Sequence, residues 1–261
     1  MRLEAGKESK GRIVIKIGGN EIDNLPFLEH LITLVKGLPV PPIIVHGGGK
    51  EITDLQEKLG IKCKKIQGLR VTDEASLKIT EMVLSGSVNK RLVKMFVMAG
   101  EKAIGISGVD GHLFKAEKLY MGGNDLGWVG TIVDVNTRMV EDLLQLGFLL
   151  VISPISLGND GQVFNVNADA AAQAIAEALK VETLIFITDV PGVKIGGEIL
   201  DILKITDIEK YIQSGEISGG MIPKVRASRH AIQQGVKTVI ITNARNFLLG
   251  KGTKIRDNIA V

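Results

Sequence analysis

The stretch IVIKIGG, residues 13–19, decides the fold class of this chain. Four of its first five residues are β-branched and apolar, a pattern typical of a short strand buried on both faces of a parallel sheet. Two glycines follow at once, where such a strand passes into a helix. The stretch PIIVHGGGK, residues 42–50, repeats this order of strand and glycine loop. The repetition predicts an α/β fold built on parallel strands.

Further segments along the chain have the same buried-strand pattern, and helical patterns lie between them. Residues 111–136 interrupt the alternation and are typical of small antiparallel strands joined by Gly-Gly and Asn-Asp turns. Strands that alternate with helices predict a mainly parallel sheet covered by helices on both faces. We predict strands at 13–17, 42–45, 103–106, 148–152, 183–188 and 238–242, and helices at 25–35, 50–59, 73–99, 137–145, 170–179 and 224–234.

Composition places the chain among ordinary globular proteins. Of its 261 residues, 45% are hydrophobic and 23% charged, which excludes intrinsic disorder. Its apolar runs are shorter than the roughly 20 residues of a spanning helix, so no membrane partner is expected. Residues 1–12 are charged and lack an apolar core, so no secretory signal is expected. The one cysteine, Cys63, cannot form an internal disulfide, which favours a cytoplasmic location.

Charge and aromatic content argue against nucleic acid as a partner. The 32 basic and 29 acidic residues leave a net charge of +3, too balanced for a general nucleic-acid binder. Aromatic residues make up 4% of the chain, too few for base-stacking platforms. The four histidines and the single cysteine show no zinc-site spacing. The 31 glycines, many of them directly after apolar runs, therefore become the place to look for function.

The two glycine loops stand where open α/β sheets bind their ligands, at the carboxyl ends of strands. Glycine lets the backbone approach a ligand, and exposed N–H groups beside a helix N-terminus attract anions. Neither loop is a Walker A motif or a Gly-x-Gly-x-x-Gly dinucleotide motif, and each alone also fits a purely structural turn. Lys16 interrupts an apolar strand, which suits either a phosphate clamp or a lysine that points outward at the strand end.

Polar side chains recur at two later strand ends. Asn165, Asn167 and Asp169 alternate just before an Ala-rich helix. They either converge on a ligand or supply a helix cap, because asparagine and aspartate are good caps. Residues 188–193, Thr-Asp-Val-Pro-Gly-Val, form a turn after an apolar strand, again in the position where such sheets bind ligands.

Two basic residues stand at predicted helix starts. Lys224 follows the loop Ser-Gly-Gly at 218–220, and it is either a mobile phosphate contact or a surface lysine. Arg70 precedes the helix predicted at 73–99, and it is either a bidentate carboxylate ligand or a solvated side chain.

In this order the motifs resemble those of the amino-acid kinase family, over residues 12–255. The resemblance implies a three-layer α/β/α sandwich with a central, mainly parallel sheet, forming a single kinase domain over residues 1–261. An N-terminal lobe of residues 12–170 is expected to bind an acyl amino acid and form a homodimer, and a C-terminal lobe of residues 171–261 to bind ATP. The motifs are KIGGN (16–20), HGGG (46–49), GLRVTD (68–73), VNKRLV (88–93), GWVG (127–130), NVNAD (165–169), TDVPGV (188–193) and GGMIPK (219–224).

The resemblance also implies a reaction: transfer of the γ-phosphoryl group of ATP to the side-chain carboxylate of N-acetyl-L-glutamate, a step of arginine biosynthesis. Lys16 and Lys224 are expected to flank the transferred group, with Asp169 holding both lysines. Mg²⁺ is expected to bridge the ATP phosphates without a dense cage of protein ligands. Backbone N–H groups of Gly18, Gly19, Gly47 and Gly48 are expected to donate to the same charge. Substrate contacts are expected from Gly47, Gly48, Arg70 and Asn165, and nucleotide or phosphate contacts from Gly18, Gly19, Thr188, Asp189, Val190, Gly192, Val193, Gly219 and Gly220.

Two other functions stay open at this point. One is a kinase for aminoadipate or glutamate attached to a carrier protein, and the other is a catalytically silent relative that binds a nucleotide or an amino acid. A regulatory protein partner stays open too. Residues 1–11 show no apolar stripe, so the N-terminal helix that builds hexamers in arginine-inhibited members is not expected.

Overall fold

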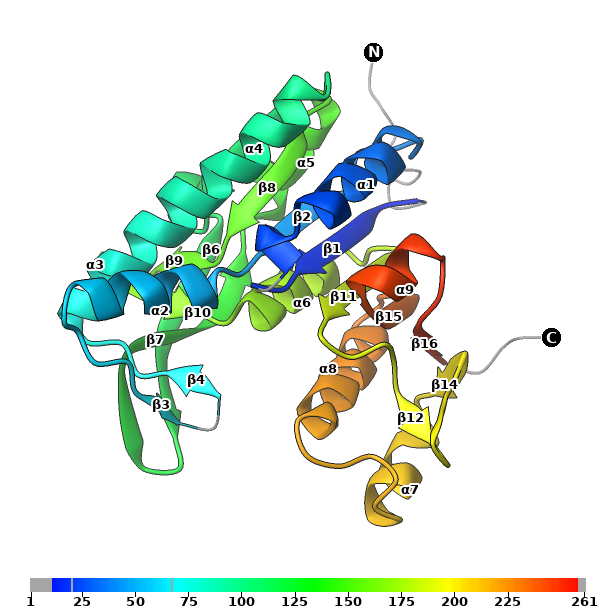
Figure 1. Ribbon diagram of the computed structural model, residues 1–261. Helices are drawn as coiled ribbons and strands as arrows, with labels where there is room; N and C mark the ends of the chain where they lie inside the picture. The colour runs from blue at the N-terminus through cyan, green and yellow to red at the C-terminus, as the bar shows by residue number, and fades with distance from the viewer. Residues whose placement is uncertain (1–10, 20, 67, 258–261) are drawn as a thin grey trace.

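An eight-stranded sheet crosses the molecule (Figure 1). The structure is a computed structural model that describes residues 11–19, 21–66 and 68–257. Neighbouring strands are parallel except for one antiparallel pair, β15 and β16, at the edge formed by the end of the chain. In order across the sheet the strands are β14 (Ile202–Lys204), β16 (Thr253–Arg256), β15 (Thr238–Asn243), β11 (Thr183–Thr188), β1 (Ile13–Ile17), β2 (Ile43–His46), β8 (Leu149–Ser153) and β5 (Ala103–Ser107).

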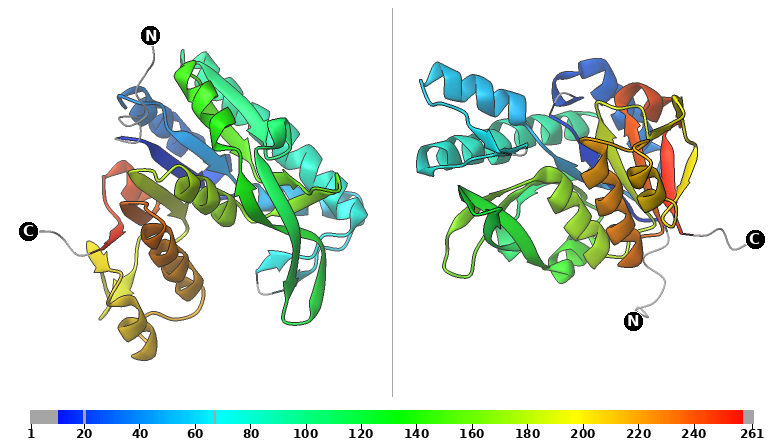
Figure 2. Two further views of the ribbon diagram at one scale, coloured as in Figure 1. Left: turned by 180° about the vertical axis from the view of Figure 1, so that it is seen from behind. Right: turned by 90° about the horizontal axis from the view of Figure 1, so that it is seen from below.

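Helices cover both faces of this sheet, as Figures 1 and 2 show. Alternate side chains of one strand enter different cores: Val14 packs on one side of the sheet and Ile15 on the other. The three-layer α/β/α architecture expected from the sequence is thereby confirmed. The face reached by Ile15 carries α1 (Leu25–Lys36), α2 (Gly49–Lys58), α3 (Glu74–Glu81), α4 (Asn89–Met98) and α9 (Ala244–Leu248), and the face reached by Val14 carries α5 (Thr137–Gln145), α6 (Ala168–Ala178), α7 (Ile208–Gln213) and α8 (Met221–Gln233).

The helix predicted at 73–99 is not one α-helix. A π-helical segment, η2 (Met82–Val88), separates α3 from α4. Its centre, Ser-Gly-Ser at 85–87, is made of weak helix formers, and the Ser85 hydroxyl lies 2.8 Å from the Ser153 hydroxyl at the end of β8. Leu84 of this segment packs against Gly48, where an added Cβ atom would lie 2.7 Å from a Leu84 methyl carbon. The widened turn therefore fits the helix against a glycine loop.

Two other helices begin earlier than predicted. Helix α6 starts at Ala168 because the Asn167 side-chain oxygen accepts hydrogen bonds from the backbone N–H groups of Asp169 and Ala170, at 2.8 and 3.3 Å. This satisfies two of the N–H groups that a helix start leaves without partners. Helix α8 starts at Met221, so Lys224 lies within its first turn.

The interrupting segment forms a small closed sheet, as its antiparallel pattern indicates. One tight turn joins β6 (Phe114–Met121) to β7 (Asn124–Val135), and Gly122 and Gly123 there adopt φ of 55° and 77°. The expected Asn-Asp turn is wrong, because Asn124 already pairs with Met121 in the ladder. β9 (Ile155–Leu157) and β10 (Val163–Val166) complete this sheet.

Short elements connect these layers. Two hairpins, β3 (Lys65–Ile66) with β4 (Leu69–Arg70) and β12 (Lys194–Ile195) with β13 (Glu198–Ile199), and two 3₁₀ turns, η1 (Glu21–Asp23) and η3 (Asp110–His112), lie outside the large sheet. Within the described residues no helix is long and apolar enough to cross a membrane. The stretch 1–11, expected to lack an added helix, lies outside the described residues apart from Gly11.

Candidate functional site

The two glycine loops lie side by side at the carboxyl edge of the sheet, because β1 and β2 are neighbouring parallel strands. Gly19 follows β1, and Gly47, Gly48 and Gly49 follow β2. A Cβ atom added to Gly19 would lie 3.1 Å from the backbone nitrogen of Gly49. A side chain at Gly19 would therefore push the loops apart, so this close approach favours glycine.

Only part of the expected set of amide donors is available for a ligand. The N–H of Gly18 donates to the Ile187 carbonyl at 3.2 Å, and the N–H of Gly47 donates to the Ile17 carbonyl at 3.1 Å. These two bonds continue the parallel ladders past the strand ends, so the expectation that Gly18 and Gly47 donate to phosphate is corrected. Across the described parts of the chain, the N–H groups of Gly19 and Gly48 meet no acceptor, and both residues line the cavity below.

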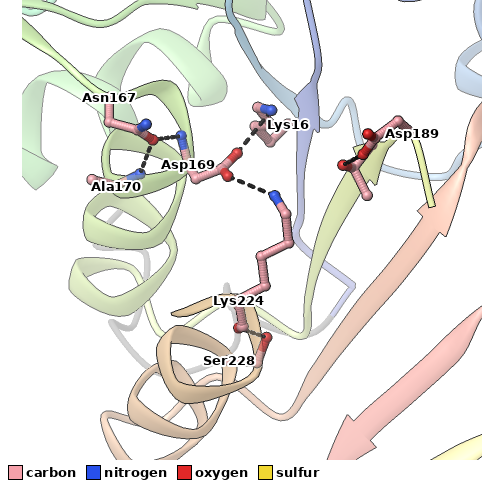
Figure 3. A network of polar contacts seen from close by, with 8 residues as sticks. Lys16, Asn167, Asp169, Ala170, Asp189, Lys224 and Ser228 are labelled. Atoms are coloured by element: carbon pink, nitrogen blue, oxygen red, sulfur yellow. Dashed lines mark hydrogen bonds and ion pairs between the residues drawn. The ribbon is translucent and has the colours of Figure 1, made fainter. Parts of the chain in front are cut away.

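Two lysines from distant parts of the chain meet one carboxylate (Figure 3). Lys16 Nζ lies 2.8 Å from Asp169 Oδ1, and Lys224 Nζ lies 3.0 Å from Asp169 Oδ2. Lys16 comes from β1, Asp169 from the first turn of α6 and Lys224 from the first turn of α8. Of the alternating polar residues, Asn167 supplies the helix cap, while Asp169 faces the two lysines.

The Asp169 carboxyl stays ionised in this setting. Burial alone would raise its pKa, but the positive charges of Lys16 and Lys224 and their hydrogen bonds outweigh burial, and the pKa lies below its usual value. The start of α6 adds a favourable helix dipole. The cluster therefore carries two positive charges against one negative charge, which leaves it ready to receive an anion.

A cavity of about 220 Å³, here named the Arg70 cavity, opens beside Lys16. Its wall includes the expected residues Gly47, Gly48, Arg70, Asn165 and Asp169, so the structure brings them together. Asn165 Nδ2 donates to the Thr72 hydroxyl at 3.0 Å, which orients its amide at the rim of the small closed sheet.

Arg70 is held by the protein itself. Its two terminal nitrogens donate to Gln56 Oε1, the Cys63 sulfur, the Gly49 carbonyl at 2.9 Å and the Thr53 hydroxyl at 2.8 Å. The residue is 8% exposed, so the solvated alternative is excluded. A carboxylate ligand would reach this guanidinium by sharing or replacing some of these acceptors.

The expected nucleotide residues divide between two further cavities. The Asp189 cavity, about 490 Å³, shares Lys16 and Gly19 with the Arg70 cavity and adds Gly18, Thr188 and Asp189. The Pro191 cavity, about 220 Å³, is lined by Val190 and Gly192 from the turn after β11 and by residues 216–218 before α8.

Three of the expected nucleotide residues lie elsewhere. Val193 is fully buried in the core, where its backbone N–H donates to the Thr253 hydroxyl, so a direct contact of its side chain with a nucleotide is ruled out. Gly219 and Gly220 are exposed in the loop just before α8, and Gly220 lines a further cavity of about 450 Å³ whose wall includes Asp169 and Lys224.

Lys65, which no sequence motif marks, lines both the Arg70 and the Asp189 cavities. It stands in a lysine-rich stretch, residues 62–65, that gives no sign of which lysine faces the site. Sequence reasoning also assigned no role to His46 and Asn89, which are both fully buried behind the second glycine loop.

Fold and site together define an α/β protein that gathers two lysines, a carboxylate and glycine-loop amides at one sheet edge. The chain belongs to the amino acid kinase family, which matches residues 11–243. An acetylglutamate kinase of Roseiflexus sp. (strain RS-1) is 46% identical over 251 residues, covering 96% of this chain and 95% of that protein.

Solved structures share this fold. The smu.665 protein of Streptococcus mutans UA159 is 31% identical, with a TM-score of 0.81 over 95% of this chain and 99% of that one. A carbamate kinase of Giardia shares the fold, with a TM-score of 0.67 at 16% identity over 95% of this chain and 99% of that one.

Proposed function

We propose that this protein is an acetylglutamate kinase. It transfers the γ-phosphoryl group of ATP to the side-chain carboxylate of N-acetyl-L-glutamate and so forms an acyl phosphate in arginine biosynthesis. The observation that carries the proposal is the pair of lysines held on Asp169, beside a cavity whose wall includes Lys16, Asp169 and Arg70. The 46% identity to an acetylglutamate kinase over nearly the whole chain supports the choice of acceptor.

The lysines and the loop amides supply the charge compensation that phosphoryl transfer needs. The acceptor carboxylate is already ionised at pH 7, so no general base is required. Catalysis then rests on positioning and on neutralising the charge of the transferred group. In the proposal Lys16 and Lys224 bind its oxygens from two sides, and the N–H groups of Gly19 and Gly48, which meet no acceptor among the described residues, donate to the same charge. Asp169 forms an ion pair with each lysine and so holds the two side chains in position before substrate binds.

The acceptor enters the Arg70 cavity in this proposal. Arg70 pairs with the α-carboxylate, because a guanidinium binds carboxylates in a fixed geometry. Asn165 contacts the remaining polar groups, with its amide oriented by Thr72. The side-chain carboxylate of the acceptor then points toward Lys16 and the glycine loops, which line the same cavity.

ATP occupies the C-terminal side in this proposal. Its phosphates lie in the Asp189 cavity beside Thr188, and its nucleoside lies toward Val190 and Gly192 in the Pro191 cavity. Asp189 and Glu21 line the phosphate end, and such carboxylate oxygens suit Mg²⁺. Bound with the nucleotide, Mg²⁺ neutralises charge on the β- and γ-phosphates.

The remaining features of the proposal concern assembly and organisation. The division into lobes at residues 170 and 171 falls within α6, so the two lobes share one sheet and one helix.

A homodimer through the N-terminal lobe is supported by exposed apolar side chains on η2 and α4: Met82, Val97 and Met98 are 58%, 49% and 80% exposed. A cytoplasmic location is supported by the presence of a single cysteine.

The test measures magnesium-dependent ADP release with N-acetyl-L-glutamate as acceptor and traps the acyl phosphate with hydroxylamine. Wild type is expected to turn over. Lys16→Ala and Lys224→Ala are expected to lower kcat by about 10² to 10³, the usual cost of one transition-state donor. Lys237→Ala is the control. That lysine is exposed, and its ion pair with Glu182 is long, at 4.0 Å. Wild-type ATP binding without turnover would contradict the proposal and favour a carrier-linked acceptor or a silent binder.

A further inference from the structure

His46 is a buried titratable residue that the proposed mechanism does not use. It ends β2 directly before the second glycine loop, and its side chain is fully shielded from solvent. Its Nδ1 atom lies 2.9 Å from the Gly47 carbonyl oxygen, and its Nε2 atom lies 3.2 Å from Asn89 Nδ2. Both ring nitrogens therefore have defined partners.

The partners fix the tautomer of the ring. A carbonyl oxygen can only accept, so the Nδ1 atom of His46 must carry the proton and donate it to Gly47. The Nε2 atom then accepts from Asn89. The orientation of the Asn89 amide is set independently, because its Nδ2 atom also donates to the Val151 carbonyl at 2.9 Å and its Oδ1 atom accepts from Lys90 Nζ at 3.1 Å.

The bond to Gly47 also orients the amide of the next residue. The carbonyl of Gly47 and the N–H of Gly48 belong to one peptide plane, and every peptide among the described residues is trans. In a trans peptide these two groups point in opposite directions. With the carbonyl turned toward His46, the N–H of Gly48 points away from His46, and the Gly48 nitrogen lies near Gly19. An added Cβ atom on Gly19 would lie 3.6 Å from that nitrogen.

We propose that His46 is a positioning residue: a neutral imidazole, fixed by Asn89, that holds the Gly47 carbonyl and thereby aims the Gly48 N–H at the transferred phosphoryl group. A free peptide in a glycine-rich loop can rotate, and a rotated Gly47–Gly48 peptide would present a carbonyl oxygen to an anion. The Val151–Asn89–His46–Gly47 chain of hydrogen bonds prevents this rotation. The inference rests on the proposed function, because it assigns a task in phosphoryl transfer.

The electrostatics of the site support a permanently neutral ring. Burial lowers the pKa of His46 to about 4, with Arg91 and Lys90 adding to the effect and the bond to Gly47 opposing it. A second proton on Nε2 would face the donor atom of Asn89. The ring therefore keeps one proton throughout the physiological range, and the bond to Gly47 does not depend on pH there.

Two variants separate positioning from filling space. In His46→Asn the side-chain nitrogen replaces Nδ1 and still reaches the Gly47 carbonyl, while the contact with Asn89 is lost. In His46→Gln the amide extends to the Nε2 position, toward Asn89, and leaves the Gly47 carbonyl without its donor. Thr242→Val serves as a control, because it removes a buried hydroxyl, 2.7 Å from the Lys251 carbonyl, in β15, a strand that borders neither β1 nor β2.

The readout is kcat and KM in the assay for ADP release and acyl phosphate, with melting temperatures from calorimetry. We expect His46→Gln to lower kcat by about 10-fold or more. This is a part of the 10² to 10³ that a removed donor costs, because the donor is misaligned and not deleted. The KM for ATP and the KM for N-acetyl-L-glutamate are expected to change less. His46→Asn is expected to stay within about 3-fold of wild type, and Thr242→Val to keep wild-type kcat. A kcat for His46→Gln equal to or above that of His46→Asn overturns the inference.

A spectroscopic measurement on the wild-type protein tests the same point without variants. ¹⁵N-resolved spectra of the histidine rings are expected to assign one of the four to the Nδ1–H tautomer, unchanged from pH 5.5 to 8. A His46 ring that titrates near pH 6.5, or that carries its proton on Nε2, overturns the inference. Absence of turnover by wild type would instead remove the proposed function, and the tautomer would then stand as a structural finding only.

Discussion

The Oδ1 atom of Asp169 lies 2.8 Å from the Nζ atom of Lys16, with only 12% of the lysine side chain exposed. A lysine on a buried strand is costly unless it meets a negative charge, and this contact supplies one. The second carboxylate oxygen binds Lys224 at 3.0 Å, so one carboxylate orients both cations. The arrangement fixes the spacing of two charges that would otherwise repel each other.

Asp169→Asn keeps the shape of the side chain and removes its charge. We expect kcat to fall by about 10- to 100-fold, because the two lysines then repel each other without a fixed counter-charge. A double-mutant cycle with Lys16→Ala checks the reason. The loss in the double variant is expected to be well below the product of the two single losses, since the residues act as one unit. Independent, multiplying effects would contradict this reading of the cluster.

Stability is expected to depend on pH through His46. Its pKa is lowered from 6.5 to about 4 in the folded protein, so between these values the unfolded chain binds a proton that the folded protein does not. Unfolding is therefore favoured as pH falls through this window, and the stabilisation is fully present above pH 6.5. At about 1.4 kcal/mol per pH unit the loss reaches about 3 kcal/mol near pH 4. Denaturant melts of wild type and His46→Asn at several pH values measure it, and the variant is expected to show a flatter profile. Equal slopes for both proteins would refute the assignment.

Much of the fold could be predicted from the sequence because the strands are short, apolar and buried on both faces. Val14 and Ile15 show why. They lie on opposite faces of β1 and each packs into a core, so apart from Lys16 the strand is an apolar run without alternating polar residues. The break in the helix at 73–99 could not be predicted. It lies where Leu84 packs against Gly48, a residue distant in sequence.

The candidate site was predicted less completely, for similar reasons. Glycine motifs mark where a loop must be tight, but they do not say which amide is free. The ladder bonds of Gly18 and Gly47 appear only when β11 and β1 lie beside them. Lys65 and His46 likewise gain their positions from neighbours that no local pattern reveals.

Arg70→Lys is expected to raise KM for N-acetyl-L-glutamate by about 10-fold or more while kcat changes less. Lysine keeps the charge but offers a point donor in place of a planar fork, so bidentate pairing with the α-carboxylate is lost. It also cannot reach Gln56, Thr53 and the Gly49 carbonyl together, so the pocket loses its internal support. Steady-state kinetics at saturating ATP measure both constants. An unchanged KM for the acceptor would show that the Arg70 guanidinium does not bind the substrate.

A pair of neighbouring glycines tests how tightly the second loop is packed. In Gly48→Ala the new methyl group would lie 2.7 Å from Leu84 Cδ2 and 3.3 Å from Val88 Cγ2, so η2 must shift. We expect a loss of stability of about 1 to 3 kcal/mol, the usual cost of overpacking a core. Gly49→Ala is the matched control: the methyl group meets no atom within 4 Å, and alanine favours the first turn of α2. Its free energy of unfolding is expected to equal or exceed that of wild type in urea melts. Equal losses in both variants would mean that the contact between η2 and the loop does not constrain the site, and that the π-helical turn has another cause.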